Sequence, residues 1–351
     1  MFYKMNMSLN NKNLNSKNLN FTLYTMIFLS SMMIMNSSSW LSAWMGLEIN
    51  MMSFIPLMMN NKNYLKPSNS MMMYFLIQSI SSSTLIMMML NLKMMKMNFY
   101  QNYISSLMLM SLIMKMGAAP FHWWLPKILN NLSWINCMIL MTWQKIAPIT
   151  LMTNLLNNYS MIYLSALMSM FMGTILSMNQ TSLKMILSFS SINHMGWMMI
   201  TMLMNLKLMI IYFLFYSFIN LIICLYLNKL NINFMNQMFK INNNKMIKLI
   251  MNSFFLSLGG IPPFLGFLPK LLILILMIKN NMIIETFMLI ILTLMILTIY
   301  LNPFISTLLI NKMNIKWMNK INKNFNSNKL NLMSINIMLT LIIFMSFMKK
   351  F

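Results

Sequence analysis

The sequence predicts an all-α polytopic membrane protein of about eleven transmembrane helices, arranged as two inverted five-helix repeats that each contain a broken helix. Three observations support this fold class. The 351 residues are 59% hydrophobic and only 8% charged, whereas soluble domains carry about 25% charged residues. The apolar residues form long segments, and one motif containing Gly and Pro occurs twice. The composition therefore excludes a water-soluble enzyme.

The apolar residues form about eleven segments, each long enough to cross roughly 30 Å of hydrocarbon as a helix. These segments are 21–39, 41–59, 70–90, 102–124, 133–153, 159–178, 185–204, 208–227, 247–278, 282–301 and 333–348. They divide the chain into a polar N-terminal extension (1–20), a first repeat (21–153), a second repeat (159–301), a polar segment (302–332) and a C-terminal span (333–351). The polar segment 302–332 is either an interfacial amphipathic helix or an irregular loop.

The charge is strongly unbalanced, with 25 basic residues against two acids and a formal net charge of +23. The chain contains 54 Met and lacks Val, Asp and Arg, which indicates a very AT-rich mitochondrial gene read by a code in which ATA means Met. Lysine is then partly a default residue, so its number says little about a partner. A nucleic-acid partner is rejected, because the lysines are spread over short loops without a basic aromatic platform.

The positions of the lysines predict the orientation of the chain. About 16 lie in loops on the N-terminal side of the membrane and about six on the other side, and positive loops face the compartment of synthesis. The N-terminus is therefore expected in the mitochondrial matrix. An odd number of spans places the C-terminus in the intermembrane space, and the protein is a multi-pass protein of the inner membrane. The first twenty residues do not resemble a transit peptide.

Four charged residues lie well inside apolar segments instead of in loops or near segment ends: Glu48, Lys115, Lys145 and Lys270. Each costs about 2.5–3.5 kcal/mol at the centre of a membrane helix. Codon drift or static ion pairing could account for them. Drift would not spare the other apolar segments, however, and it cannot supply Glu. The interpretation that we favour is a proton relay, because burial disfavours the charged form of lysine and a nearby carboxylate favours it.

The remaining candidates for chemistry are weaker. His122 and His194 are polar stations of the relay or hydrogen-bonded core residues. Glu285 lies near the start of its segment and is expected to reach the membrane surface. Cys137 and Cys224 stand alone in apolar segments and are expected to be buried and unpaired. We expect no metal site, and the sequence contains no dinucleotide or phosphate-loop motif.

A motif of the form G-x-x-P-F-x-x-x-L-P-K occurs at 117–127 and again at 260–270. Proline removes a backbone hydrogen bond, and a membrane tolerates the resulting break only against protein or water. The two breaks fall in the fourth and ninth segments. An offset of five spans inverts one half of the chain relative to the other. Paired broken helices in inverted repeats indicate a transport pathway.

Five motifs, two of which include the repeated motif, occur in order along the chain: W-x-G-L-E-x-N-M-x-x-F-I-P (44–56), K-x-G-x-A-P-F-H-x-W-x-P (115–126), T-W-Q-K-x-A-P (142–148), S-S-I-x-H-M-G-W (190–197) and L-S-L-G-G-x-P-P-F-x-G-F-x-P-K (256–270). In these motifs the chain resembles the mitochondrially encoded, antiporter-like chain 2 family of NADH-ubiquinone oxidoreductase, or respiratory complex I. The resemblance covers about residues 40–300. It implies eleven spans with two inverted five-helix repeats.

The resemblance also implies roles for individual residues. Glu48 would be the acidic partner of Lys115, Lys145 the central relay residue and Lys270 the distal lysine, with His194 a further member of the polar axis. No cofactor is implied in this chain. NADH, FMN, iron–sulfur clusters and ubiquinone would be bound by other subunits of the complex. The partners would be other membrane-arm subunits, both antiporter-like and small, together with lipids and protons.

Two other functions fit the same residues. A free-standing cation/proton antiporter would show the same helices and lysines, but it would be isolated alone instead of within a large assembly. A purely structural membrane-arm subunit would hold its lysines in fixed, dry ion pairs. A chain of bound waters joining the four charged residues would argue against that structural role.

Overall fold

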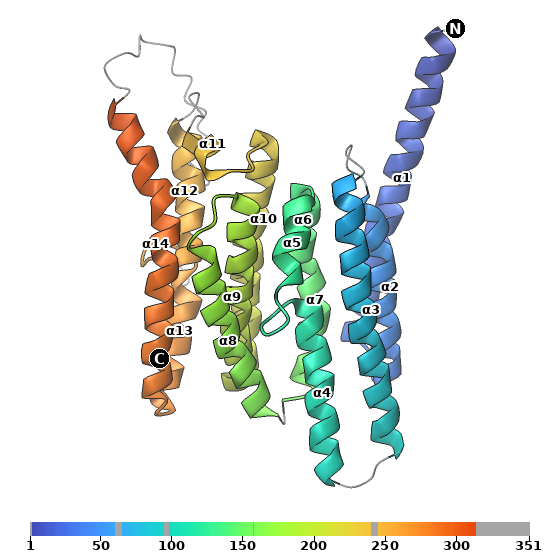
Figure 1. The fold of residues 1–351 in the computed structure, drawn as a ribbon, viewed down its shortest axis with the longest axis vertical. Helices are drawn as coiled ribbons and strands as arrows, with labels where there is room; N and C mark the ends of the chain where they lie inside the picture. Colours follow the sequence, from blue (N-terminus) through green and yellow to red (C-terminus); the bar gives the residue numbers. More distant parts are fainter. Residues whose placement is uncertain (1, 60–64, 95–97, 157, 240–244, 314–351) are drawn as a thin grey trace. The chain divides into compact units, whose positions relative to one another are not determined.

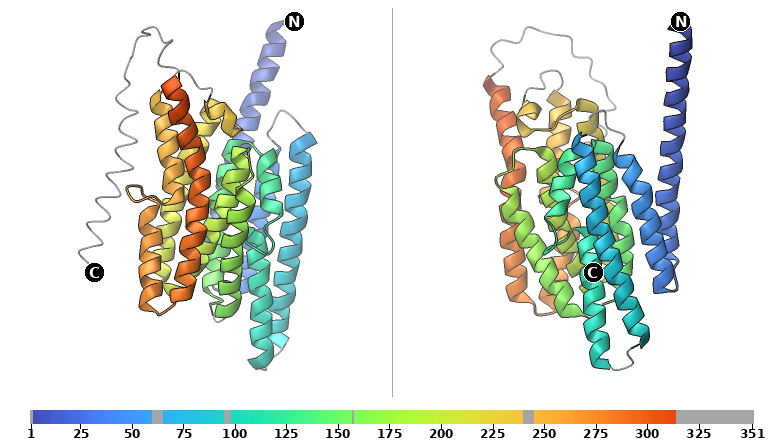
Figure 2. Two further views of the ribbon diagram at one scale, coloured as in Figure 1. Left: turned by 60° about the vertical axis from the view of Figure 1, so that its left-hand side comes forward. Right: turned by 45° about the vertical axis from the view of Figure 1, so that its right-hand side comes forward.

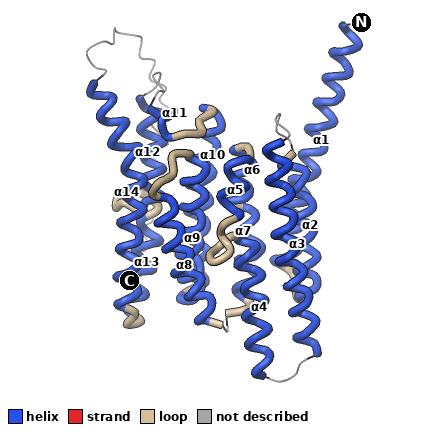
Figure 3. Tube along the Cα trace, in the orientation of Figure 1, coloured by secondary structure: helices blue, strands red, loops and turns tan. Residues whose placement is uncertain are grey.

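The computed structural model describes residues 2–59, 65–94, 98–156, 158–239 and 245–313. Within these ranges the regular secondary structure consists of α-helices joined by loops, with one isolated β-bridge between Ser182 and Phe234 (Figures 1 and 3). The chain divides into two compact units. Unit 1 comprises residues 1–117 and 123–161, and unit 2 comprises residues 118–122 and 162–351.

Unit 1 is built around the helix that carries Lys145. Its helices are α1 (Phe2–Met35), α2 (Trp40–Met58), α3 (Leu65–Met94), α4 (Asn98–Met116), α5 (Trp124–Asn131), α6 (Trp134–Met141) and α7 (Trp143–Thr153). Helix α7 packs against α1, α2, α4 and α6, and α3 packs against α2, α4 and α5. Figure 2 shows α3 and α4 side by side in both of its views. Lys145 is therefore surrounded by other helices of the unit.

Unit 2 is built around α9. Its helices are α8 (Tyr159–Ser177), whose first three residues belong to unit 1, α9 (Leu183–Met204), α10 (Leu206–Leu230), α11 (Met235–Phe239), α12 (Lys245–Gly259), α13 (Phe267–Lys279) and α14 (Ile283–Met313). Helix α9 is buried without interruption from Ile186 to Met202. It packs against α10 and α13. It also approaches α8 closely, since a Cβ atom on Gly196 would lie 2.3 Å from Met170 Cγ.

Three of the predicted segments are divided in the structure. The segments 102–124 and 247–278 break where the repeated motif begins, between α4 and α5 and between α12 and α13. The segment 133–153 was expected to be continuous, but it is interrupted at Thr142, between α6 and α7. The Thr142 hydroxyl donates to the carbonyl of Met138 at 2.7 Å. Such bonding of a Thr side chain to its own helix competes with the regular ladder and often bends helices.

In the part of the chain that the structure describes, which excludes the predicted span 333–348, five helical segments are long and apolar enough to cross a membrane by length and composition: Asn18–Met35, Ser68–Leu92, Tyr159–Ser177, Leu206–Leu230 and Ile283–Asn302. The sequence predicted ten spans in this part. The difference has a simple cause. Helices α5, α6, α7, α12 and α13 of the divided segments have 15 residues or fewer. Helix α4 has 19 residues but includes polar ones, and the long, deeply buried α9 carries a row of polar residues. Inside a bundle such residues face other helices instead of lipid.

The helix ends also differ from the expected boundaries. Helix α1 begins at Phe2 instead of residue 21, because no Gly or Pro interrupts the backbone before Met35. Helix α14 continues to Met313, so it includes the first part of the polar segment 302–332. The rest of that segment and the C-terminal span 333–351 lie outside the described residues.

Candidate functional site

The first broken helix positions Lys115. Helix α4 ends at Met116, one residue after this lysine, and the chain turns at Gly117, whose φ is +70°. A Cβ atom there would lie 2.7 Å from Leu125 Cδ1. Glycine is the residue that adopts this conformation without a steric penalty. The Gly of the repeated motif therefore ends α4 and lets α5 pack against that end.

Two neutral side chains donate hydrogen bonds to backbone carbonyls at the C-terminal end of α4. The last carbonyls of a helix have no partner within it and need other donors. The indole Nε1 of Trp124 donates to the Met114 carbonyl at 3.2 Å, and the amide Nε2 of Gln78 donates to the Lys115 carbonyl at 3.3 Å. The backbone N–H of Gly117 also reaches Met114, at 3.2 Å. The donors to the Met114 and Lys115 carbonyls are thus neutral groups.

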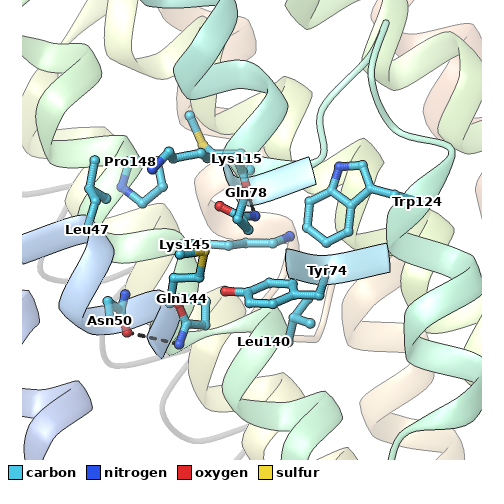
Figure 4. Close-up of a pocket in the computed structure, with 12 residues that line it drawn as sticks. Leu47, Asn50, Tyr74, Gln78, Lys115, Trp124, Leu140, Gln144, Lys145 and Pro148 are labelled. Carbon is cyan, nitrogen blue, oxygen red and sulfur yellow. Dashed lines mark hydrogen bonds between the residues drawn. The ribbon is translucent and has the colours of Figure 1, made fainter. Parts of the chain in front are cut away.

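Lys115 and Lys145 share one cavity (Figure 4). Their side chains are only 8% and 2% exposed, respectively. The cavity has a volume of about 20 Å³, which holds about one water molecule. It is lined by Leu47, Asn50, Met51, Tyr74, Gln78, Lys115, Met116, Trp124, Leu140, Gln144, Lys145 and Pro148. Two lysines from different helices, α4 and α7, can therefore interact through the same small volume.

A pair of neutral amides holds α7 beside α2 at this cavity. The side-chain nitrogen of Gln144 donates to Asn50 Oδ1 at 3.0 Å (Figure 4). Asn50 is buried and Gln144 is half-buried. Since Gln144 precedes Lys145 in the chain, this bond fixes the turn of α7 from which the Lys145 side chain projects.

Glu48 lies at the edge of the site. It is half-buried on α2, two residues before Asn50, and does not line the cavity. Its carboxylate is nevertheless close enough to Lys115 for a Coulomb interaction between the two side chains. The carboxylate of Glu48 therefore acts on Lys115 electrostatically, from outside the cavity.

Lys270 has surroundings of a different kind, in unit 2. Its ammonium nitrogen donates to the carbonyls of Leu258 and Gly259, each at 3.0 Å. These carbonyls belong to the end of α12, where the second motif turns the chain at Gly260 with a φ of +85°. A Cβ atom on Gly260 would lie 3.0 Å from Lys270 Cδ. Lys270 is thus itself the hydrogen-bond donor to the carbonyls at the end of α12, where the second segment is broken.

The two histidines are both buried and lie outside the cavity of Lys115 and Lys145. His122 Nδ1 lies 3.3 Å from the Pro120 carbonyl in the loop of the first break. His194 Nδ1 lies 2.8 Å from the hydroxyl of Tyr212, which α10 supplies. Within the described ranges, no three His, Cys, Asp or Glu side chains gather closely enough to hold a metal.

The sequence predicted Lys115 and Lys145, which the structure brings to one cavity, but it did not predict the neutral polar residues beside them. Gln78, Asn50 and Gln144 line the cavity, and Tyr212 pairs with His194. A signal was present for each amide. Gln78 is a polar residue within an apolar segment, and the other two lie in the motifs around Glu48 and Lys145. Buried amides need hydrogen-bond partners, so they also mark places where helices meet.

Residues 37–298 match the family model described as "NADH:quinone oxidoreductase/Mrp antiporter, TM". The fold and the match together define the class of antiporter-like membrane proteins. Among curated relatives, NADH-ubiquinone oxidoreductase chain 2 of Anopheles gambiae is 43% identical over 304 residues, covering 85% of this chain and 89% of the relative. The same protein of Locusta migratoria is 40% identical, covering 85% and 90%. The chain belongs to the NADH-ubiquinone oxidoreductase chain 2 family.

Solved structures share the fold at low sequence identity. A chain of respiratory complex I from Thermus thermophilus superposes with a TM-score of 0.76 at 18% identity, covering 82% of this chain and 70% of that chain. A chain of the membrane-bound sulfane sulfur reductase, an archaeal respiratory membrane complex, gives a TM-score of 0.73 at 15% identity, covering 91% and 72%. The antiporter-like fold is therefore common to different respiratory membrane complexes.

Proposed function

We propose that this chain is a proton-translocating membrane-arm subunit of mitochondrial NADH:ubiquinone oxidoreductase, respiratory complex I. The observation that carries the proposal is the shared cavity of Lys115 and Lys145, two lysines buried inside a bundle of membrane helices. Buried lysines are costly, and intramembrane ionisable residues mark ion and proton pathways. Membership of the chain 2 family supports the same function.

The mechanism is electrostatic. Quinone reduction in other subunits displaces charge along the membrane arm and shifts the interaction between Glu48 and Lys115. This change alters the balance of charge in the shared cavity, so that Lys145 and then Lys270 gain or lose a proton in turn. His194 and His122 serve as additional polar stations. Each proton that crosses the membrane works against roughly 2.3 kcal/mol per 100 mV.

The remaining assignments follow from this role. NADH, FMN, iron–sulfur clusters and ubiquinone bind to other subunits, and this chain contributes no redox centre. Its partners are other membrane-arm subunits and the lipids of the inner mitochondrial membrane. The chain has eleven spans, with inverted repeats at 21–153 and 159–301. Its N-terminus lies in the matrix and its C-terminus in the intermembrane space, as the distribution of loop lysines supports.

The test is a Lys145→Ala substitution in the assembled complex. Because Lys145 is only 2% exposed and lines the shared cavity, we expect proton uptake by proteoliposomes, driven by NADH oxidation, to fall while the amount of assembled complex stays unchanged. Lys127→Ala is the matched control, since Lys127 is exposed and lies over the Trp123 ring at 5.4 Å. Proton uptake at the normal level in Lys145→Ala would remove Lys145 from the relay.

A further inference from the structure

We propose that Gln78 is the positioning residue of the lysine cavity. Its amide nitrogen holds the end of α4, and its amide oxygen is the fixed acceptor through which Lys115 and Lys145 exchange a proton by way of water. This inference rests on the proposed proton relay and assigns the relay a residue that does not itself titrate.

The first step is the hydrogen bond at the end of α4. Gln78 projects from α3 and donates through Nε2 to the carbonyl of Lys115, at 3.3 Å. This carbonyl is one of those that a helix end leaves without a partner. The bond therefore ties the backbone of a relay lysine to a neighbouring helix. A shift of α3 or α4 at this point would move the Lys115 side chain within the cavity.

The second step concerns the other end of the amide. A Gln side chain has donors on nitrogen only and acceptors on oxygen only. Donation to the Lys115 carbonyl therefore fixes which end is oxygen. Gln78 lines the cavity and is only 6% exposed. A buried amide oxygen needs a donor. The cavity lining offers the two lysines, Tyr74 and the N–H groups of Asn50, Gln144 and Trp124, and the cavity volume admits a water.

The third step is the charge around Gln78. The titratable side chains that line its cavity are Lys115 from α4, Lys145 from α7 and Tyr74 from α3, while Glu48 of α2 interacts with Lys115 from outside. Two ammonium groups in one cavity repel each other, so one proton is readily shared between them. Figure 4 shows Gln78 beside both lysines in the lining of the cavity, and its acceptor oxygen would reach them through a water in this volume.

Two substitutions of nearly the same shape test the proposal in the assembled complex. Gln78→Met removes both ends of the amide, and we expect proton uptake at neutral pH to fall about five-fold, the effect of one positioned hydrogen bond. Gln78→Glu places a carboxylate among the ammonium groups and favours their charged forms. The alkaline limb of the pH profile of proton uptake should then move upward by about one unit.

The matched control is Gln101→Met, because Gln101 lies exposed on α4; it should keep the normal rate and pH profile. A merely structural role for Gln78 would lower the amount of complex without moving the pH profile. If Gln78→Met fails to assemble, Gln78→Glu decides, and an unchanged profile in that variant overturns the proposal. Normal uptake in Lys145→Ala would instead overturn the relay itself, whatever the Gln78 variants do.

Discussion

The two broken helices carry the same sequence motif, yet different groups donate hydrogen bonds to the backbone carbonyls where each helix ends. At the first break, the end of α4 accepts hydrogen bonds from the Trp124 indole and the Gln78 amide. At the second, the end of α12 accepts two from the ammonium group of Lys270. Both turns depend on a Gly with positive φ. The motif therefore specifies where the helix breaks, whereas the surrounding side chains determine which donors bind the carbonyls at the break.

The difference teaches that the buried lysines do not share one role. A cation at the C-terminal end of a helix is favoured by the helix dipole and by charge-assisted hydrogen bonds. Lys270 has both, so part of its role is structural. At the first break the Met114 and Lys115 carbonyls accept from neutral donors, and Lys115 lines a cavity shared with Lys145. The equivalent of Lys270 in the first motif is Lys127, which is exposed and contacts Trp123.

The largest effect on this comparison is expected from Lys270→Met. The substitution leaves the carbonyls of Leu258 and Gly259 without their charged donor, which should destabilise the end of α12 by about 3 kcal/mol. Faster hydrogen exchange of the amides at 258–261 in the assembled complex would measure it. Lys127→Met, at the equivalent motif position, should change exchange at its own break by no more than about 0.5 kcal/mol. Equal effects of Lys270→Met and Lys127→Met would contradict the inference that only the second break depends on a lysine.

A smaller effect is expected from Trp124→Phe. It removes one neutral hydrogen bond to the Met114 carbonyl and keeps most of the packing, so the end of α4 should lose about 1 kcal/mol. Hydrogen exchange of the Gly117 amide, which reaches the same carbonyl, reports the change. Trp123→Phe is the control because Trp123 is 48% exposed. A loss of stability as large as that of Lys270→Met would mean that the neutral donor at the first break and the charged donor at the second stabilise their helix ends equally.

The sequence predicted those features that depend on local backbone chemistry or on the cost of charge in a membrane. Gly117 and Gly260, with the prolines that follow, placed both breaks, and the position of Lys145 within an apolar segment predicted its burial. Contacts between helices could not be predicted in this way. The Gln78 bond to the end of α4 joins residues 37 positions apart, and the Asn50–Gln144 bond joins residues 94 apart.

The interruption at Thr142 had no signal of its own, because Thr is common in membrane helices and neither Gly nor Pro stands beside it. Its consequence is local to the site. The backbone N–H of Lys145 donates to the carbonyl of Thr142, three residues earlier, at 3.3 Å. This tighter turn sets the direction in which Lys145 leaves α7. This interruption of the helix at Thr142 is visible in the structure but not in the sequence.

Proton exchange between Lys115 and Lys145 requires water in their shared cavity. A map of the assembled membrane arm at a resolution that shows waters tests this requirement most directly. We expect an ordered water in the cavity, within hydrogen-bond distance of the Gln78 oxygen and of at least one lysine amino group, because the volume of about 20 Å³ admits about one water. A dry cavity, with both lysines held in fixed direct contacts and without access to water, would contradict the relay and support a structural role.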